Sequence, residues 1–464
     1  MLLVAFDGRV GLLAVSGMET SLFLLLLAMA FQARLAERPA LAGAAAGLSA
    51  WARPEGLILL GVFALDGLLG RLGPGRPAGT RLSGLRFGLP AGLLASAFLG
   101  FNLALGGTLL PGTFAAKTTY YAVLGRSGFL ATGLAATFAS GAWLALLPLA
   151  LARLFAEAWQ TLRGRPAPLR REAGWVLALP LAYALLLPFA HRFERYLVPA
   201  LPAFSVLALA GLRDAARWLA RRPLPRAGLA ARLLAGSLLL PAGLLQAGSA
   251  ARGDRDYRFF CAYHQARHER TGHWLAAHTP PDAVVATHDV GAIAYYSRRR
   301  VVDLVGVVLP EAVAHLHRPD YTGYLEDLFR RERVTHLAML RSWGEVVNAA
   351  PLFVADPAPE VMEVFAWLPG ITHLMPLEAS ALNAQARAEL ASGRPDRARA
   401  LVLRSLELDA RSSRSWLLLG ATHERSGGRA EAERAYRQAL ALFPGDAEAR
   451  RRLAALLARK GGAD

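Results

Sequence analysis

The stretch Ser16–Gly56 reads SGMETSLFLLLLAMAFQARLAERPALAGAAAGLSAWARPEG and sets the pattern for the first half of the chain. A short basic turn, ARLAERP, joins two apolar segments, and each segment has a carboxylate at one end, Glu19 or Glu55. Arg53 stands two residues before Glu55. A charged side chain inside lipid is costly, about 2.5–3.5 kcal/mol at the centre of a membrane helix on insertion scales. These three residues therefore either face a polar cavity or lie in the headgroup layer, and the sequence leaves both interpretations open.

The composition of the whole chain is typical of a membrane protein with several domains. Of its 464 residues, 54% are hydrophobic, and this length exceeds that of one ordinary domain. The 52 Lys and Arg residues outnumber the 35 Asp and Glu residues. They interrupt hydrophobic runs instead of gathering on one soluble face, so we expect no nucleic-acid partner. The single cysteine, Cys261, excludes an intramolecular disulfide framework and a cysteine zinc cluster.

Eight apolar segments predict a polytopic bundle of transmembrane helices. They are residues 17–33, 40–52, 56–70, 87–105, 128–152, 174–190, 197–212 and 230–248. The second and third are short for a bilayer, which needs about 20 residues per helix. Arginines flank this pair on both sides, at Arg34 and Arg38 and again between Arg71 and Arg86. Because both basic flanks are expected in the cytoplasm, an even number of crossings must separate them. This favours a hairpin that turns at ARPEG over one long span.

The basic residues between these segments predict an orientation. One set of alternate loops carries seventeen arginines, and the other set carries five arginines and one lysine. Since cytoplasmic loops are enriched in Lys and Arg, we expect the first set in the cytoplasm. SGMET, ARPEG, the remaining loops and everything after about residue 250 are then expected on the outer side.

The predicted outer loop LPGTFAAKTTYY (Leu110–Tyr121) contains Lys117, one of two lysines in the chain. A compact ammonium group suits a phosphate as a point charge. The alternative is a lysine that extends along the interface to reach water. Both interpretations remain open at this point.

A second outer stretch, HRFERYLVPALPAF (His191–Phe204), carries two arginines three residues apart, followed by Tyr196. On a helix Arg192 and Arg195 share a face, and two guanidinium groups can clamp a phosphate. The alternative is that Glu194 pairs with one of them.

After residue 250 the pattern changes to that of a small α/β domain. The segments AVVAT, RRRVVDLVGVV and THLAML predict strands, whereas VGAIAYYS and YLEDLFRRERV predict helices. His264 and His268 are four residues apart, but no carboxylate or cysteine pattern accompanies them, so we expect solvated helix histidines. Asp289 lies between a strand and a helix, where aspartate is a good N-cap.

Taken together, four stretches resemble the bacterial membrane glycosyltransferases of the GT-C superfamily, relatives of the lipid-linked mannosyl- and arabinosyltransferases. The stretches are SGMETSLF with ARPEG, LPGTFAAKTTYY, HRFERYLVPALPAF, and VVATHDVGAIAYYSRRRVVDLVGVVLPE (Val284–Glu311), and the resemblance covers roughly residues 1–375. It implies a multi-pass enzyme of the bacterial cytoplasmic (inner) membrane. The enzyme would transfer a sugar from a polyprenyl-phosphate donor to a lipid, glycan or protein acceptor on the periplasmic side. Membrane lipid and lipid-linked sugar are the implied partners. No cofactor is implied, and the need for a divalent metal stays open.

The resemblance also implies which residues act. In the family the catalytic acidic loop lies between the first two spans, whereas this chain begins at a stretch that looks like the end of a later span. We therefore expect the catalytic residue upstream of Met1, in a chain that is a fragment or has lost its chemistry. Glu19 and Glu55 are the remaining carboxylate candidates, first as residues that shape the site and second as bases. The alternative is that both simply pair with Arg53. The expected substrate-binding residues are Arg53, Lys117, Arg192, Arg195 and Tyr196, and no metal ligands are expected.

Residues 379–446 contain a repeat with the tetratricopeptide pattern and its period of 34 residues. The positions that match are Trp416, Leu419, Gly420, Ala432, Tyr436, Ala439 and Pro444. A degenerate copy lies 34 residues earlier, and Ala447–Lys460 reads as a capping helix. Because a repeat module of this kind packs on itself and carries no chemistry, it implies a protein or peptide partner.

The sequence therefore predicts a mainly α chain in three parts. These are a partial transmembrane bundle of about eight spans (1–250), an extracytoplasmic α/β domain (251–376) and tetratricopeptide repeats with a capping helix (377–464). We expect an enzyme, a glycosyltransferase of GT-C type. The alternative is a non-catalytic scaffold whose spans only tether the repeats to the membrane. A transporter would show repeats among the spans and ionisable groups at mid-span, and neither is clear.

Overall fold

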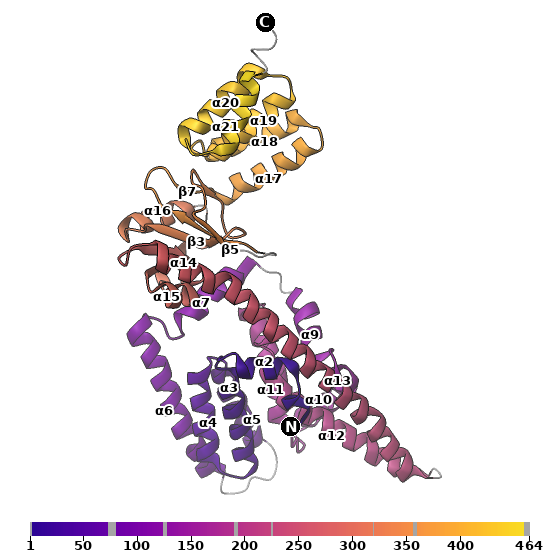
Figure 1. Cartoon of the computed structure of the whole chain (residues 1–464). Coiled ribbons are helices and arrows are strands. Elements are labelled where there is room, and N and C mark those ends of the chain that lie inside the picture. Colours follow the sequence, from indigo (N-terminus) through magenta and orange to yellow (C-terminus); the bar gives the residue numbers. More distant parts are fainter. Residues whose placement is uncertain are drawn as a thin grey trace. The chain divides into compact units, whose positions relative to one another are not determined.

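The computed structural model describes residues 2–72, 80–123, 128–189, 194–223, 226–318, 320–355 and 360–458. The chain is mainly helical and divides into two compact units, Met1–Phe260 and Cys261–Asp464 (Figure 1). Each unit has hydrophobic cores of its own.

The first unit consists of helices that run back and forth and are joined by short turns. In chain order the elements are α1 Leu2–Ala5, α2 Gly8–Val15, α3 Thr20–Leu35, α4 Pro39–Ala52, α5 Gly56–Leu72, α6 Thr80–Gly106, α7 Gly112–Tyr120, η1 Tyr121–Val123, η2 Phe129–Gly133, α9 Leu134–Phe138, α10 Ala142–Leu162, α11 Arg170–Leu186, η4 Val198–Ala200, α12 Leu201–Ala220 and α13 Ala227–His264.

Small residues decide how α4 packs. A Cβ on Gly43 would lie 2.1 Å from the carbonyl oxygen of Phe87, and one on Gly47 would lie 2.8 Å from the Cβ of Leu94. Two glycines four residues apart thus let α4 and α6 approach backbone to backbone, a packing typical of membrane helices. Trp51 closes the contact by donating to the carbonyl of Leu94 at 3.0 Å.

In the described part of the chain, four helical runs are long and apolar enough to cross a membrane: 83–106, 142–162, 198–220 and 227–278. A fifth is added if α2 and α3, which meet at an angle of 116°, count as one span. The prediction of about eight spans is therefore wrong in number. Helix α4 has 14 residues, which gives a length of about 21 Å, short of the roughly 30 Å of hydrocarbon. Helices α3, α5 and α11, with 16, 17 and 17 residues, also fall short of the length of a span.

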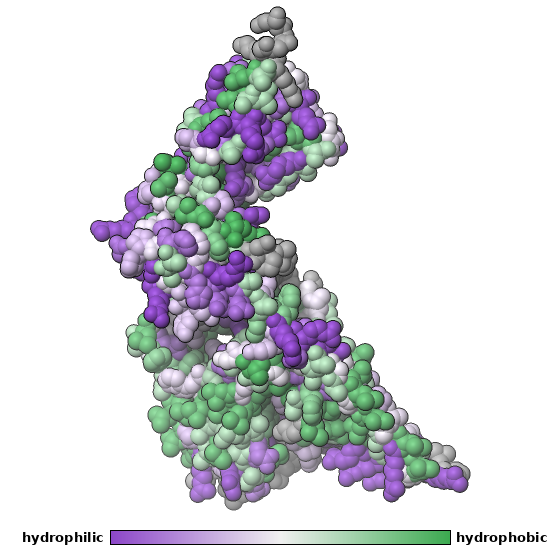
Figure 2. Space-filling view, viewed as in Figure 1, coloured by the Kyte–Doolittle hydropathy of each residue, from purple (hydrophilic) through white to green (hydrophobic). Residues whose placement is uncertain are grey.

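The apolar residues of these short helices form a protein core. Phe23, Leu59, Trp175 and Leu179 are fully buried where α3, α5 and α11 meet. By contrast, several leucines of α6 and α13 point outward, and among them Leu89 is 77% and Leu244 68% exposed. Figure 2 shows apolar side chains gathered over the helices of this unit. Such a surface fits membrane association.

The predicted span 128–152 is broken in the structure. The π-helical η2 and the short α9 precede a turn at Ala139–Gly141, and Gly141 has φ +56°. Glycine adopts this left-handed conformation readily. A new helix, α10, then begins at Ala142.

The second unit contains a five-stranded sheet with the order β2-β1-β3-β6-β5. Strand β1 is parallel to β2 and β3, whereas β6 is antiparallel to β3 and β5. All four residues of β1 are buried, as expected for an apolar central strand. The strands are β1 Val284–Thr287, β2 Arg300–Asp303, β3 His336–Leu340, β5 Phe353–Ala355 and β6 Met362–Ala366; a separate antiparallel pair is β4 Val346–Val347 and β7 His373–Leu374. The helical elements are η5 Gln265–Glu269, α14 Arg270–His278, α15 Val290–Ser297, η6 Pro310–His315 and α16 Tyr321–Arg331.

The same unit ends in five helices: α17 Leu377–Ala391, α18 Pro395–Leu408, α19 Ser413–Arg425, α20 Arg429–Leu442 and α21 Ala447–Ala458. Helices α17 with α18 and α19 with α20 form antiparallel pairs, and α21 packs on α20. A Cβ on Gly420 would lie 2.4 Å from the ring of Tyr436, so this glycine allows α19 and α20 to pack closely. The predicted repeat positions Trp416 to Pro444 thus begin in α19 and end just after α20.

Candidate functional site

A cavity of about 480 Å³ opens in the first unit, where α3 and α5 begin and α4 and α11 end. Because successive helices alternate in direction, Glu19, Arg53, Glu55 and Tyr183 reach the same end of the helices, although they are far apart in sequence. Helix α7 contributes Lys117 to the same cavity.

Arg53 is the centre of the polar part of this cavity. It is 3% exposed, and its guanidinium donates to Glu55 Oε1 at 2.5 and 3.0 Å and to Glu19 Oε1 at 3.2 Å. A further bond of 3.0 Å goes to Thr20 Oγ1. The pairing of both carboxylates with Arg53 is the alternative that the sequence left open. One buried cation therefore ties the start of α3 to the α4–α5 turn.

Two tyrosines complete this polar cluster. Tyr183 donates its hydroxyl proton to Glu55, and its ring stacks on Tyr196 with 5.0 Å between centroids and 12° between planes. The guanidinium carbon of Arg53 lies 5.4 Å from the centroid of the Tyr196 ring. All three hydrogen bonds go to Glu55 Oε1, so this carboxylate, which is 8% exposed, is held by both Arg53 and Tyr183.

Two more cations surround the Tyr196 ring. The Nζ of Lys117 lies 5.8 Å and the guanidinium carbon of Arg195 5.2 Å from the ring centroid. Arg195 also contacts the sulfur of Met18 at 3.0 Å, and its buried Nε has no hydrogen-bond partner. Within the described ranges, neither Lys117 nor Arg195 forms an ion pair with a carboxylate. The cavity thus holds two cations that no carboxylate of the described residues balances.

The rest of the cavity wall is apolar. Its side chains include Ile58, Phe98, Phe114 and Leu186. Trp51 and Leu186 are 42% and 58% exposed, so part of this wall reaches the outer surface of the helices. A polar end with spare positive charge and an apolar remainder suits an amphiphile with an anionic headgroup.

The structure brings together six of the seven predicted site residues, namely Glu19, Arg53, Glu55, Lys117, Arg195 and Tyr196. The seventh, Arg192, lies outside the described residues. Glu194, which the sequence offered as a partner for Arg192 or Arg195, lies 3.5 Å from the guanidinium of Arg9.

Sequence reasoning missed Tyr183 and Thr20. Tyr183 lies in LPLAYALLL, where its hydroxyl is the only polar side-chain group, and this isolated hydroxyl near the end of an apolar helix could have drawn attention to it. Thr20 lies in METSLFLL between Glu19 and Ser21, so its hydroxyl does not stand out in the sequence.

In the second unit the histidine predictions need correction. His268 is buried rather than solvated, and its Nε2 lies 2.8 Å from Asp289 Oδ2. Its Nδ1 lies 3.0 Å from Nδ1 of the exposed His264. Asp289 is the N-cap residue of α15, as predicted, but its side chain makes no capping hydrogen bond, because it binds His268 instead. Across the described part of the chain, no group of three His, Cys, Asp or Glu side chains is placed to hold a metal ion.

Comparisons with known proteins bear mainly on the second unit. A family model described as a domain of unknown function matches residues 255–389, and a tetratricopeptide repeat model matches residues 413–456. No curated protein and no solved structure gives a match. The chain therefore contains a tetratricopeptide repeat formed by α19, α20 and α21.

Proposed function

We propose that the first unit is a membrane glycosyltransferase of GT-C type. It binds the phosphate of a polyprenyl-phosphate-linked sugar in the 480 Å³ cavity and transfers the sugar to an acceptor outside the cytoplasmic membrane. One observation carries the proposal. Lys117 and Arg195 lie at the polar end of a cavity with apolar walls, and no described carboxylate pairs with either of them.

In this proposal the two unpaired cations hold the donor phosphate. Arg53 cannot contribute a full charge, because Glu19 and Glu55 both pair with it. Lys117 offers a mobile ammonium group, and Arg195 offers a buried Nε–H that lacks a partner. When the bond between the sugar and the phosphate oxygen breaks, the polyprenyl phosphate leaves as an anion, and these two cations stabilise it.

The apolar wall takes the lipid part of the donor. Ile58, Phe98 and Phe114 line the cavity next to the polar cluster, and Leu186 leads to the outer surface of the helices. A polyprenyl chain in contact with these side chains would continue directly into the surrounding lipid. Burial of each CH₂ group against them contributes about 0.8 kcal/mol.

Transfer also needs a base that takes the proton from the acceptor hydroxyl as the new glycosidic bond forms. Of the two carboxylates at the cavity, Glu55 is buried and bound by Arg53 and Tyr183, so it positions Arg53. Glu19 is 45% exposed and makes one ion pair, so it is the more accessible candidate. The resemblance places the family's own base in an acidic loop that the described residues do not include.

A second function has its own support. The comparisons match only the domain of unknown function and the tetratricopeptide repeat, and tetratricopeptide repeats generally mediate protein–protein interaction. Both carboxylates at the cavity are engaged by Arg53. A membrane-anchored interaction protein without catalysis would show these features as well.

The test separates the two functions. The full chain in membranes is assayed for turnover of a polyprenyl-phosphate sugar and for binding of the polyprenyl phosphate alone. We expect Lys117→Ala and Arg195→Ala each to weaken lipid-phosphate binding and to raise KM, by about tenfold for a lost charge-assisted hydrogen bond. Arg38→Ala, which removes an exposed arginine at the far end of α3, is the matched control and should change neither.

Unchanged binding and turnover in both cavity variants would refute the phosphate assignment. If the wild-type chain binds polyprenyl phosphate but turns over no sugar donor, the interaction protein is the better description.

A further inference from the structure

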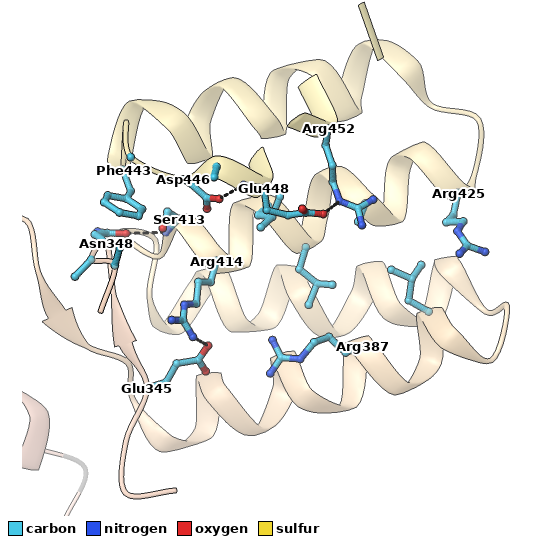
Figure 3. Close-up of a pocket in the computed structure, with 18 of the residues that line it drawn as sticks. Glu345, Asn348, Arg387, Ser413, Arg414, Arg425, Phe443, Asp446, Glu448 and Arg452 are labelled. Carbon is cyan, nitrogen blue, oxygen red and sulfur yellow. Dashed lines mark hydrogen bonds and ion pairs between the residues drawn. The ribbon is translucent and has the colours of Figure 1, made fainter. Parts of the chain in front are cut away.

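A groove of about 750 Å³ runs along α17, α19 and α21 in the second unit (Figure 3). These are the first helices of the two helical pairs and the helix that caps them, so they form the inner face of the repeat. The segment after β4, residues 348–350, closes one end of the groove. The groove is therefore shared by the repeat helices and the end of the sheet region.

Asn348 fixes this end wall in place. It is 5% exposed, and its side-chain amide donates to the carbonyls of Ile371 and Arg411 at 3.1 and 2.9 Å. Its side-chain oxygen accepts from the backbone N–H of Ser413 at 3.0 Å, at the start of α19. Asn348 adopts φ +58°, a conformation that asparagine tolerates better than most residues. The wall is thus bound to the repeat, and the groove does not depend on a loose loop.

The floor of the groove is apolar. Leu390 comes from α17, Leu417 and Leu418 come from α19, and Phe443 comes from the turn before α21. Leu390, Leu417 and Phe443 remain partly exposed. An occupant with at least one apolar side chain would cover them.

The charges around the groove are unbalanced. Arg414 binds Glu345 at 2.8 Å, and Arg452 binds Glu448 at 2.8 Å. Asp446 accepts from the backbone N–H groups of Glu448 and Ala449, the second and third residues of α21, both at 3.0 Å, and serves as its cap. The three carboxylates of the lining are therefore engaged.

Two lining arginines have no such partner. Arg387 on α17 and Arg425 on α19 are exposed, and within the described residues neither makes an ion pair or a side-chain hydrogen bond. In Figure 3 no dashed line reaches either of them. Each therefore has all its guanidinium donors available to an incoming carboxylate.

From this arrangement we infer that the groove binds an acidic peptide segment of a partner protein. Its carboxylates pair with Arg387 and Arg425, and an apolar side chain between them covers the leucine floor. Three helices about 10 Å apart span roughly 20 Å, which an extended chain crosses in about six residues. A basic segment would face unbalanced positive charge and would have to displace Arg414 or Arg452 from its carboxylate.

The test uses the full chain in detergent micelles and a random dodecapeptide library displayed on phage. We expect the selected pool to be enriched in Asp and Glu together with Leu, Ile or Phe. An enriched peptide, labelled with a fluorophore, should bind about tenfold more weakly when its acidic residues are changed to Asn and Gln. The double variant R387E/R425E should weaken binding about a hundredfold, because it replaces two attractions with two repulsions.

The matched control is R397E/R404E. Both of these arginines are exposed on α18, lie outside the groove lining and make no ion pair with a described residue. This variant changes the net charge by the same amount and should leave binding within about twofold of the wild type. Circular dichroism of both variants checks that the helices remain folded.

Three results would overturn the inference. One is a selected pool that is neutral or basic, or no enrichment at all. Another is an acidic peptide that binds R387E/R425E as tightly as the wild type. The third is an equal loss of binding in R397E/R404E, which would show attraction by net charge rather than by this groove.

Discussion

The two ends of the helices in the first unit use arginine in different ways. At one end, Arg170 and Arg171 both bind Asp66, at 2.7 and 2.6 Å, and join the start of α11 to α5. At the other end, around the cavity, Arg195 is partly buried and has no carboxylate partner among the residues described. At the first end both arginines have a carboxylate partner, whereas at the second end Arg195 has none among the described residues and is available to an anionic ligand.

This difference separates cations that stabilise the fold from cations that are available to a ligand. A half-buried arginine with a carboxylate stabilises the contact between two helices, and its removal leaves the carboxylate unpaired. A cation beside a cavity without a partner adds little to stability and gains its partner only when an anion binds. Arg53 belongs to the first group although it lies at the cavity, because Glu19 and Glu55 neutralise it.

The largest effect should come from Arg53→Gln. The change leaves the buried carboxylate of Glu55 without its cation and removes the link to Glu19 and Thr20. We expect the first unit to lose about 3–5 kcal/mol of stability, the cost of breaking a buried pair from one side. Thermal unfolding of the full chain in detergent, followed by tryptophan fluorescence, measures it, because Trp143 and Trp175 are buried in this unit.

Lys117→Ala is the matched variant for that comparison. Lys117 makes no ion pair with any carboxylate that the structure describes. The unfolding temperature of this variant should therefore stay close to that of the wild type while lipid-phosphate binding falls. Equal destabilisation by Arg53→Gln and Lys117→Ala would abolish the distinction between the two kinds of cation.

In the second unit, unlike the charged arginines of the first, the buried side chain of His288 is neutral at pH 7. The side chain of His288 is 1% exposed and stacks on Trp343 at 4.1 Å between centroids. Its Nε2 lies 3.3 Å from Asp289 Oδ2, yet neither ring nitrogen has the geometry of a hydrogen bond. Burial lowers the pKa of His288 to about 4, although the charge of Asp289 opposes the shift.

Acid should therefore destabilise the second unit through His288. The unfolded chain takes up the proton near the ordinary pKa of about 6.5, whereas the folded chain takes it up only near 4. The free energy of unfolding is thus lost as the pH falls through this window, by about 2.5 kcal/mol between pH 7.5 and 4.5. Chemical denaturation of the full chain at several pH values measures the slope.

His288→Phe is the control for this slope, since it keeps an aromatic ring against Trp343 and removes the titrating group. Between pH 7.5 and 4.5, the free energy of unfolding of this variant should fall by about 2.5 kcal/mol less than that of the wild type. A variant with the wild-type slope would show that another group controls the acid response. The pKa of Asp289 is already lowered below its ordinary value of 3.8, so this neighbour stays charged throughout the window.

The sequence predicted which residues share the cavity, because the direction of each helix follows from the chain order and the arginine bias of the loops. Glu19, Arg53 and Lys117 come from three separate turns, yet alternation places all three at one end. It could not predict that Tyr183 binds Glu55, because such a bond depends on the rotation of α11 about its axis. Nor could it show that both glutamates pair with Arg53 rather than stand free.

The predicted number of membrane spans was wrong for a related reason. Hydropathy cannot tell an apolar face that meets lipid from one that meets protein, and the short helices α3, α4 and α5 bury much of theirs. In the second unit, the strands β1, β2 and β3 and the helix α16 were predicted from their apolar patterns. Strands β5 and β6 were missed, since FVA and MEVFA are short runs and the residues between them, DPAPEV, lack the Asn-Gly or Asp-Gly pair of a two-residue hairpin.

The smallest effect should come from Asp66→Asn, which tests the paired end directly. The amide keeps the shape of the side chain but removes the charge that binds Arg170 and Arg171, and both arginines are partly exposed, at 23% and 22%. Water can therefore solvate them, and we expect a loss of about 1–2 kcal/mol, below that for a fully buried pair. The unfolding temperature measures this loss, and polyprenyl-phosphate binding should stay at the wild-type level because Asp66 lies about ten residues along α5 from the cavity. Suppose that Asp66→Asn weakened lipid binding as much as Lys117→Ala does. Anion binding at the cavity would then depend on the ion pairs at the other end of the helices, and the two groups of arginines would not be independent.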